Sequence, residues 1–238
     1  LMEAAIGSEI AYYLIKPVKP KQILLAIKKI LDQKRLVTEK TTTDYRKEFS
    51  RIGDMIAAAS TCDDWSELYR RLIFWETELE KSADPGMAEI LSMQENEANN
   101  SFSRFVMKNY ISWFDPRNTG NPLLSPSLFS DKIFPNISNN RPLFFILIDN
   151  MRYDQWKTIS AELAGIYRII EEDIYFSILP TSTQFSRNAI FSGLMPSRIA
   201  ELMPQFWVND DEETGKNEFE EELFRNQLAR KGLKYKWS

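Results

Sequence analysis

The sequence has 238 residues, 43% apolar and 27% charged, a balance typical of a globular chain with one or two domains. It carries 30 lysines and arginines against 34 aspartates and glutamates, and the net charge of −4 excludes a global positive field that would recruit nucleic acid. The sequence contains no histidine, which excludes a Ser-His-Asp triad and any His-bearing zinc site within these residues.

Two further features exclude membrane insertion and an internal disulfide. The longest apolar run, 143–148, is far shorter than the roughly 20 residues that a membrane-spanning helix needs. Cys62 is the only cysteine, so no disulfide forms within the chain, and we expect a cytoplasmic location. Leu1 opens inside a predicted helix and 235–237 starts a predicted strand. We therefore expect the chain to be an internal piece of a longer protein.

Residues 1–35 have the pattern of the end of an α/β domain. A short apolar stretch, 11–15, predicts a buried strand, and the two prolines of 16–20 predict a loop after it. The helix that follows carries one apolar stripe: Ile23, Leu24, Ile27, Ile30 and Leu31. Such a unit is too small to bury its own faces, so we expect it to belong to a sheet whose other strands lie upstream.

Residues 36–115 are predicted to form a bundle of three helices. Polar caps at 60–64 and a break at 83–86 separate three stretches in which apolar residues recur at helical spacing. Aromatic stripes of this kind are more often core than cofactor site, so we expect a structural role. The three stripes are Tyr45, Phe49, Ile52, Ile56 and Ala59; Trp65, Leu68, Leu72, Trp75 and Leu79; and Met87, Ile90, Leu91, Phe102, Phe105, Tyr110 and Trp113.

Residues 116–142 are rich in proline and asparagine and form a predicted connector, whose apolar residues favour packing against the next domain. From 143 onward, segments with strand and helix patterns alternate, which predicts an α/β domain with a parallel or mixed sheet over 143–238. The predicted strands are 143–148 and 174–179. The predicted helices are a segment striped by Tyr153, Trp156, Ile159 and Leu163, then 183–191, 197–202 and 218–231.

Asp149 follows the first of these strands directly. In open α/β sheets, ligands bind in the crevice at the carboxyl ends of the strands, and Asp149 occupies such a place. A carboxylate there is either a ligand-binding group or the cap of the next helix, and the sequence leaves both interpretations open.

A hydroxyl-rich segment, Pro180–Thr183, follows the second strand and opens a predicted helix. Free amides and the positive end of the helix dipole favour an oxyanion or a phosphate there. A threonine nucleophile needs an external base or a bound divalent metal, and the alternative is an ordinary Ser/Thr N-cap. Asp149 and Thr183 are 34 residues apart, and we expect each to close a strand at the same edge of one sheet, so that together they can form half of a metal site.

The two segments resemble the alkaline phosphatase superfamily. Residues 147–152 resemble its metal-aspartate strand, and 180–196 resemble its nucleophile helix in the nucleotide pyrophosphatase/phosphodiesterase form and in the PglZ branch. The resemblance implies that Asp149 ligates zinc and that Thr183 is both zinc ligand and nucleophile, with Thr181 as the fallback nucleophile.

The same resemblance bears on the substrate and on the other metal ligands. Ser186 stands where the phosphodiesterase pattern has an asparagine, and Arg187 beside it is the candidate substitute. We expect Asn150 and Arg187 to contact the substrate. The remaining ligands of the superfamily are later aspartates and histidines, and this sequence has no histidine. We therefore expect these residues to hold at most part of one zinc site.

Residues 12–18 resemble the last strand of a response-regulator receiver domain, although a plain turn is the alternative. The resemblance makes Lys16 the signalling lysine, gives it a cis bond to Pro17, and makes 20–35 the final receiver helix. The whole order resembles response regulators of the type IX secretion system: a mixed architecture of receiver end, helical bundle and the first half of an alkaline-phosphatase-like α/β domain. It implies that an upstream part holds the phospho-accepting aspartate with its magnesium, and a downstream part the rest of the zinc site.

These resemblances imply a two-component response regulator with a zinc-dependent phosphodiesterase-like effector domain that controls type IX secretion. The implied partners are a sensor histidine kinase, secretion-motor proteins, a sigma factor and a second copy in a homodimer, and the implied substrate is a nucleotide or oligonucleotide. We expect the 238 residues by themselves to be inactive. The alternative is a non-catalytic signalling module that uses a phosphatase-like fold to bind partner proteins.

Overall fold

A computed structural model of the chain describes residues 16–82, 84–115, 117–118, 120–137, 142–209 and 215–234. The predicted strand 11–15 and the predicted strand start at 235–237 lie outside the described residues. The chain divides into two compact units. The first lies within Leu1–Asn109 and Arg152–Glu162, and the second within Tyr110–Met151 and Leu163–Ser238.

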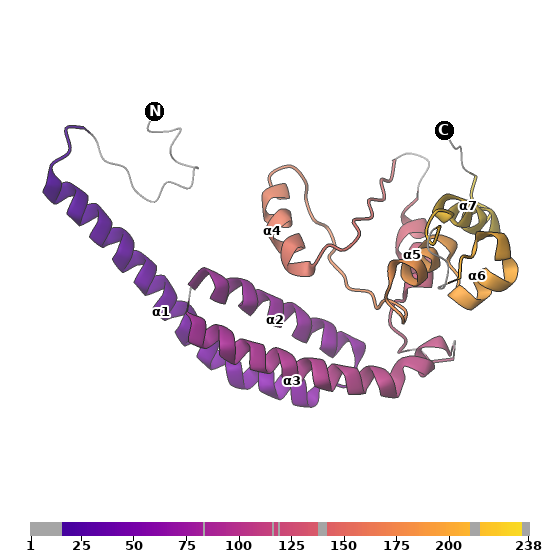
Figure 1. The fold of residues 1–238 in the computed structure, drawn as a ribbon, viewed down its shortest axis with the longest axis horizontal. Helices are drawn as coiled ribbons and strands as arrows, with labels where there is room; N and C mark the ends of the chain where they lie inside the picture. Colours follow the sequence, from indigo (N-terminus) through magenta and orange to yellow (C-terminus); the bar gives the residue numbers. More distant parts are fainter. Residues whose placement is uncertain are drawn as a thin grey trace. The chain divides into compact units, whose positions relative to one another are not determined.

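Three helices form the body of the first unit, as the apolar periodicity predicted (Figure 1). They are α1 (Pro20–Ala58), α2 (Cys62–Ser82) and α3 (Pro85–Asn109). The three stripes meet in one core in which a buried polar pair also takes part, since Tyr45 Oη donates to Gln94 Oε1 at 2.9 Å. The core consists of Tyr45, Ile52, Ile56, Trp65, Leu68, Leu72, Trp75, Leu79, Met87, Leu91 and Ala98.

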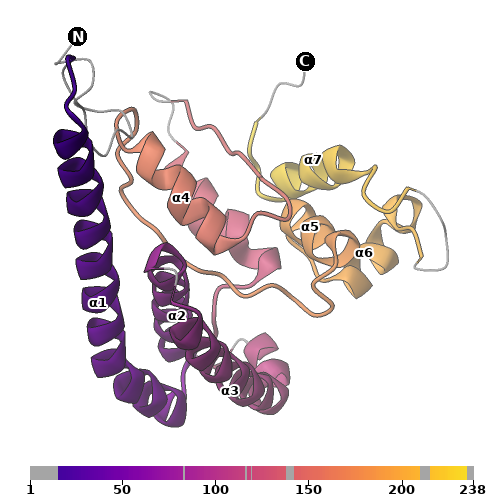
Figure 2. The same ribbon diagram turned by 60° about the vertical axis from the view of Figure 1, so that its left-hand side comes forward.

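α1 is one continuous helix, although the sequence analysis placed a domain boundary at residue 35. No glycine or proline occurs between Lys21 and Ile52, so nothing in the sequence breaks the helix there. The Arg35–Glu39 ion pair, at 3.5 Å, even spans the expected boundary. α2 and α3 lie along the second half of α1 (Figure 2). Apolar side chains of its first half, such as that of Leu24, are exposed.

A reciprocal cap separates α1 from α2. The Asp64 amide donates to Thr61 Oγ1 at 3.2 Å, and the amides of Ser60 and Thr61 donate to Asp64 Oδ2 at 3.0 and 2.9 Å. These hydrogen bonds, first of all the one from the Ser60 amide, lower the pKa of Asp64 because they stabilise the charged carboxylate. The polar run predicted to cap the second helix therefore does so in the form of a capping box.

α4 (Tyr153–Leu163) follows the first predicted strand in sequence but belongs, except for its last residue, to the first unit. The Tyr153 ring lies 5.7 Å from the Tyr69 ring of α2, at an interplanar angle of 40°. Burial raises the pKa of Glu76 on α2, and the charge of Asp154 on α4 raises it further. The helix that was predicted to cover a sheet thus packs on the helical bundle instead.

Three helices of the second unit confirm the helix predictions beyond residue 180: α5 (Thr183–Ser192), α6 (Pro196–Leu202) and α7 (Glu220–Arg230). The connector contributes short turns to the same unit: Ser125–Ser127, Phe129–Ile133 and Phe134–Asn136. The buried ring of Phe129 has four aromatic neighbours, with centroids 4.7–6.1 Å away: Phe134, Phe145, Phe191 and Phe224. The prediction that the connector packs against the following domain is confirmed.

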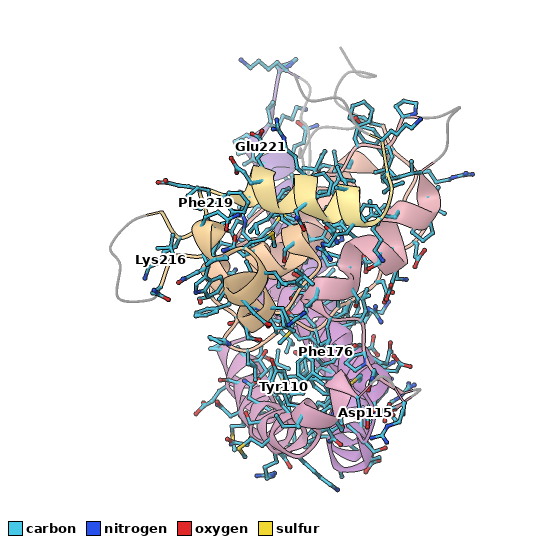
Figure 3. All side chains as sticks on the ribbon, turned by 90° about the vertical axis from the view of Figure 1, so that its right-hand side faces the viewer. Tyr110, Asp115, Phe176, Lys216, Phe219 and Glu221 are labelled. Atoms are coloured by element: carbon cyan, nitrogen blue, oxygen red, sulfur yellow. The ribbon has the colours of Figure 1, made fainter. Side chains whose placement is uncertain are left out.

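The predicted sheet is not present among the described residues. The segment 174–179 makes backbone hydrogen bonds to other groups instead: the Phe176 amide donates to the Leu123 carbonyl at 2.8 Å, and the Leu179 amide donates to Tyr110 Oη at 2.6 Å. Figure 3 labels Phe176 and Tyr110, one residue of each pair. The segment 142–148 is extended, and 84% of the Phe144 surface is exposed. A strand needs a partner for its backbone groups, and apolar composition alone does not provide one. In the described part of the chain, the predicted α/β domain thus consists of helices and extended segments without a sheet.

Gly193 ends α5 in the left-handed region, at φ +64°, and faces the buried side chain of Gln227. A Cβ added at Gly193 would lie 2.3 Å from Gln227 Nε2 and 2.9 Å from its Cδ. We expect Gly193→Ala to lower the free energy of unfolding by about 2–3 kcal/mol, because it adds a steric conflict to an unfavourable φ. Urea denaturation followed by circular dichroism measures this loss.

Gly232 provides the matched control for the steric part of that effect. It also has a positive φ, +68°, but an added Cβ there meets no atom within 4 Å. Gly232→Ala should therefore cost only the backbone term, about 1 kcal/mol. Equal losses of unfolding free energy in the two variants would show that the Gln227 side chain moves aside without cost and that only the backbone conformation matters.

Candidate functional site

The residues singled out after the two predicted strands line one pocket of the second unit. Its volume is about 690 Å³. Three segments form its wall: the turn after 142–148, the extended segment 174–179 and the first turns of α5. The lining residues are Leu147, Ile148, Asp149, Asn150, Met151, Tyr175, Ser177, Thr181, Ser182, Thr183, Ser186, Arg187 and Ile190.

Asp149 lies on the turn that ends the extended segment, and its side chain is 49% exposed. The next residue, Asn150, has φ 58°, in the left-handed region that asparagine tolerates better than most residues. α4 begins only at Tyr153, and the Arg152 amide before it donates to Gln155 Oε1 at 3.0 Å. The carboxylate of Asp149 instead accepts a hydrogen bond from Arg187 Nη1 at 3.1 Å.

Thr183 is the first residue of α5 and is exposed in the pocket. The N-cap residue is Ser182, and its side chain makes no capping hydrogen bond. The first backbone amides of a helix have no partner within the helix, and they lie at the positive end of its dipole. The start of α5 therefore presents a hydroxyl together with a favourable environment for an anion.

Arg187 lies one helical turn after Thr183 and bridges two carboxylates. Its Nη1 contacts Asp149, and its Nη2 donates to Glu220 Oε2 on α7 at 2.6 Å. Its Nε is buried and has no hydrogen-bond partner. Burial lowers the pKa of this guanidinium, but the bonds and charges of Glu220 and Asp149 outweigh that effect and raise it overall. Arg187 is therefore a permanent cation at the pocket wall.

Two other lining residues have defined roles. Ser186 Oγ lies 3.2 Å from the Thr181 carbonyl and 3.1 Å from the Ser182 carbonyl, so its proton is shared between backbone groups. It therefore does not replace the asparagine of the phosphodiesterase pattern as a free donor. Burial raises the pKa of Tyr175, and the charge of Asp149 adds to the shift, so the phenol stays protonated at neutral pH.

The donors of this pocket fit the edge of a divalent-cation site. Asp149 offers a carboxylate and Thr183 a hydroxyl, both oxygen donors, although the guanidinium of Arg187 contacts that carboxylate. Nowhere in the described ranges do three or more His, Cys, Asp or Glu side chains gather as a metal site. The described residues thus supply two donors rather than a complete ligand set.

Tyr175 lines this pocket and Glu220 holds Arg187 at its wall, and the sequence analysis missed both. Glu220 is the first of three glutamates in the first turn of α7. Such residues are common there because their negative charge complements the helix dipole, so they indicate no functional site. Tyr175 lies inside a segment that was predicted only to be a strand.

Lys16, the predicted signalling lysine, does not line this pocket. It is exposed near the start of the sequence, and a cis bond to Pro17 and then α1 follow it.

Two family models match the chain. Residues 35–114 match the PorX response regulator linker domain, which covers most of the helical bundle. Residues 128–237 match the BREX system PglZ alkaline phosphatase-like domain, which includes the whole pocket. The chain is PorX-like. A comparison with curated proteins found no match.

The PorX-like chain thus joins a response-regulator linker to a phosphatase-like effector domain. Such a linker belongs to two-component signalling, and the effector belongs to a superfamily whose members typically depend on metal ions. No helix in the described part of the chain is both long and apolar enough to span a bilayer.

Proposed function

We propose that the phosphatase-like domain hydrolyses phosphodiesters in a zinc-dependent reaction at the pocket of Asp149 and Thr183. The observation that carries the proposal is that these two side chains line one pocket although they are 34 residues apart. The PglZ match over 128–237 supports the reaction class, because it spans both residues.

Thr183 acts as the nucleophile. Its Oγ attacks phosphorus, an O–P bond forms, and the bond to the leaving oxygen breaks, so that the alcohol departs with a proton. The threonine then carries the phosphoryl group with its remaining ester; water cleaves the bond between threonine and phosphorus and restores the hydroxyl, and the net products are a phosphomonoester and an alcohol. The amides at the start of α5 stabilise the negative charge that develops on the phosphoryl oxygens.

Asp149 and Thr183 would hold the zinc ion from this side of the pocket. The ion, when bound, lowers the pKa of the threonine hydroxyl and neutralises charge on the phosphoryl group. Asn150 and Arg187 contact the substrate from the pocket wall, with Arg187 contributing a planar donor that matches phosphate oxygens. The substrate we propose is a nucleotide or a short oligonucleotide.

The linker match supports a regulatory role for this reaction. We propose that a sensor kinase phosphorylates a magnesium-dependent receiver domain in the cytoplasm, in which Lys16 contacts the phosphoryl group. Phosphorylation then biases domain arrangement or homodimerisation, and through it the effector and its partners. These partners are secretion-motor proteins and a sigma factor, and the output is control of type IX secretion.

Hydrolysis of bis(p-nitrophenyl) phosphate tests the proposal on the full-length protein. We expect turnover with zinc, its loss after chelation and its return when zinc is restored. Asp149→Asn should lower turnover at fixed zinc by on the order of 100-fold, because it removes a charged donor. Asp173→Asn is the control, since Asp173 pairs with Lys132 at 2.8 Å and does not line the pocket. Absence of turnover with zinc and several diesters would instead support the interaction module.

A further inference from the structure

The bridge made by Arg187 joins three segments of the second unit. The guanidinium contacts Asp149 at 3.1 Å and Glu220 at 2.6 Å, so the contact to α7 is the shorter one. Glu220 is also the less exposed carboxylate, at 19% against 49% for Asp149. A charged hydrogen bond is stronger where water is more excluded. Arg187 is therefore held mainly by Glu220, and its contact with Asp149 is the weaker of the two.

Glu220 is fixed independently of Asp149. Its other oxygen, Oε1, accepts a hydrogen bond from Asn217 Nδ2 at 3.2 Å, within the turn that leads into α7. The carboxylate thus keeps its position if the contact between Arg187 and Asp149 opens. Glu220 can then retain the guanidinium inside the pocket.

We propose that Arg187 is an internal cation that competes with a divalent metal ion for Asp149, and that Glu220 is a positioning residue that weakens this competition by sharing the guanidinium. A metal ion and a guanidinium repel each other at one carboxylate oxygen, so metal binding displaces Nη1. Glu220 keeps the displaced group one helical turn from Thr183, where it faces the phosphate of a substrate. The inference rests on the proposed function in one respect, that Asp149 is a metal ligand.

A double-mutant cycle on zinc affinity tests the inference. Zinc alone is titrated calorimetrically into the full-length protein and its variants. Arg187→Met removes the competitor, and we expect it to tighten zinc binding about three- to tenfold. Glu220→Gln leaves the guanidinium to Asp149 alone, and we expect binding to weaken about threefold. In the double variant the effect of Glu220→Gln should vanish, because the residue acts only through Arg187.

Three controls separate this mechanism from a general change of charge. Glu221→Gln removes the same charge one residue away, where Glu221 pairs with Arg225 at 2.5 Å, and it should leave zinc affinity unchanged. Arg187→Lys keeps the charge but cannot bridge both carboxylates, so it should fall between wild type and Arg187→Met. Asp149→Asn should remove the gain produced by Arg187→Met. Melting temperatures establish that each variant is folded.

Two outcomes overturn the inference: unchanged zinc affinity in Arg187→Met, or an equal loss from Glu220→Gln with and without Arg187. Because the titration does not use turnover, it can fail separately from the proposed function. If the zinc affinities follow the expected cycle but the protein hydrolyses no diester, the competition between Arg187 and zinc is supported and the proposed hydrolase activity is wrong. If the protein hydrolyses diesters but zinc affinity is the same in all variants, the hydrolase activity is supported and the competition is wrong.

Discussion

Thr183→Ala is expected to lower zinc-dependent phosphodiester turnover in the full-length protein by roughly 10³-fold or more, the loss typical of removing a nucleophile. The side chain is exposed at the first position of α5, and its removal opens no cavity. Alanine is a good helix former, so the start of the helix is preserved. The loss should therefore appear in kcat while the urea midpoint stays close to that of the wild type.

Thr181→Ala is the matched control, because Thr181 lines the same pocket two residues before the helix and is the alternative nucleophile. It should retain turnover within a few-fold of wild type. Mass spectrometry of acid-quenched protein should find the trapped nitrophenyl-phosphoryl group on Thr183. Unchanged turnover in Thr183→Ala, or the phosphoryl adduct on Thr181, would refute the assignment of the nucleophile.

Trp75→Ala is expected to destabilise the first unit by about 3–5 kcal/mol. Trp75 is only 8% exposed, and its ring lies 5.3 Å from the Tyr45 ring in the core of the bundle. Truncation removes a large apolar surface and leaves a cavity between α1 and α2 that the helices close only in part. The measurement is the urea midpoint of helical circular dichroism.

Phe74→Ala tests the same helix at the neighbouring position. Its side chain is 56% exposed, so its truncation loses little buried area and should cost less than about 1 kcal/mol. Similar midpoints for the two variants would show that the stripe assigned to α2 does not form the core.

The helical parts of the fold could be predicted from the sequence because their signal is local. Spacing of three and four residues identified the face of α2 that carries Trp65, Leu68 and Leu72, and all three are buried. Polar residues at 60–64 marked the cap. The continuity of α1 was missed because its first apolar stripe ends at Leu31, and no helix breaker marks an end near Arg35.

The predicted strands depended on partners that a local pattern does not contain. An apolar run such as 143–148 indicates an extended backbone, but pairing is a property of two segments. The sequence analysis brought Asp149 and Thr183 to one site through a sheet edge that the described residues do not contain, although both residues do line one pocket. It gave no sign of Glu220. Ion pairs between distant helices, such as Arg187 with Glu220, leave no periodic trace.

The membership of α4 in the first unit limits how freely this protein can be rearranged as a set of modules. A chimera that exchanges the phosphatase-like region at residue 128 would carry a foreign α4 to the surface around Tyr69. The helix and the α2 surface that receives it are therefore expected to be inherited together, and swaps between relatives should keep both from the same parent.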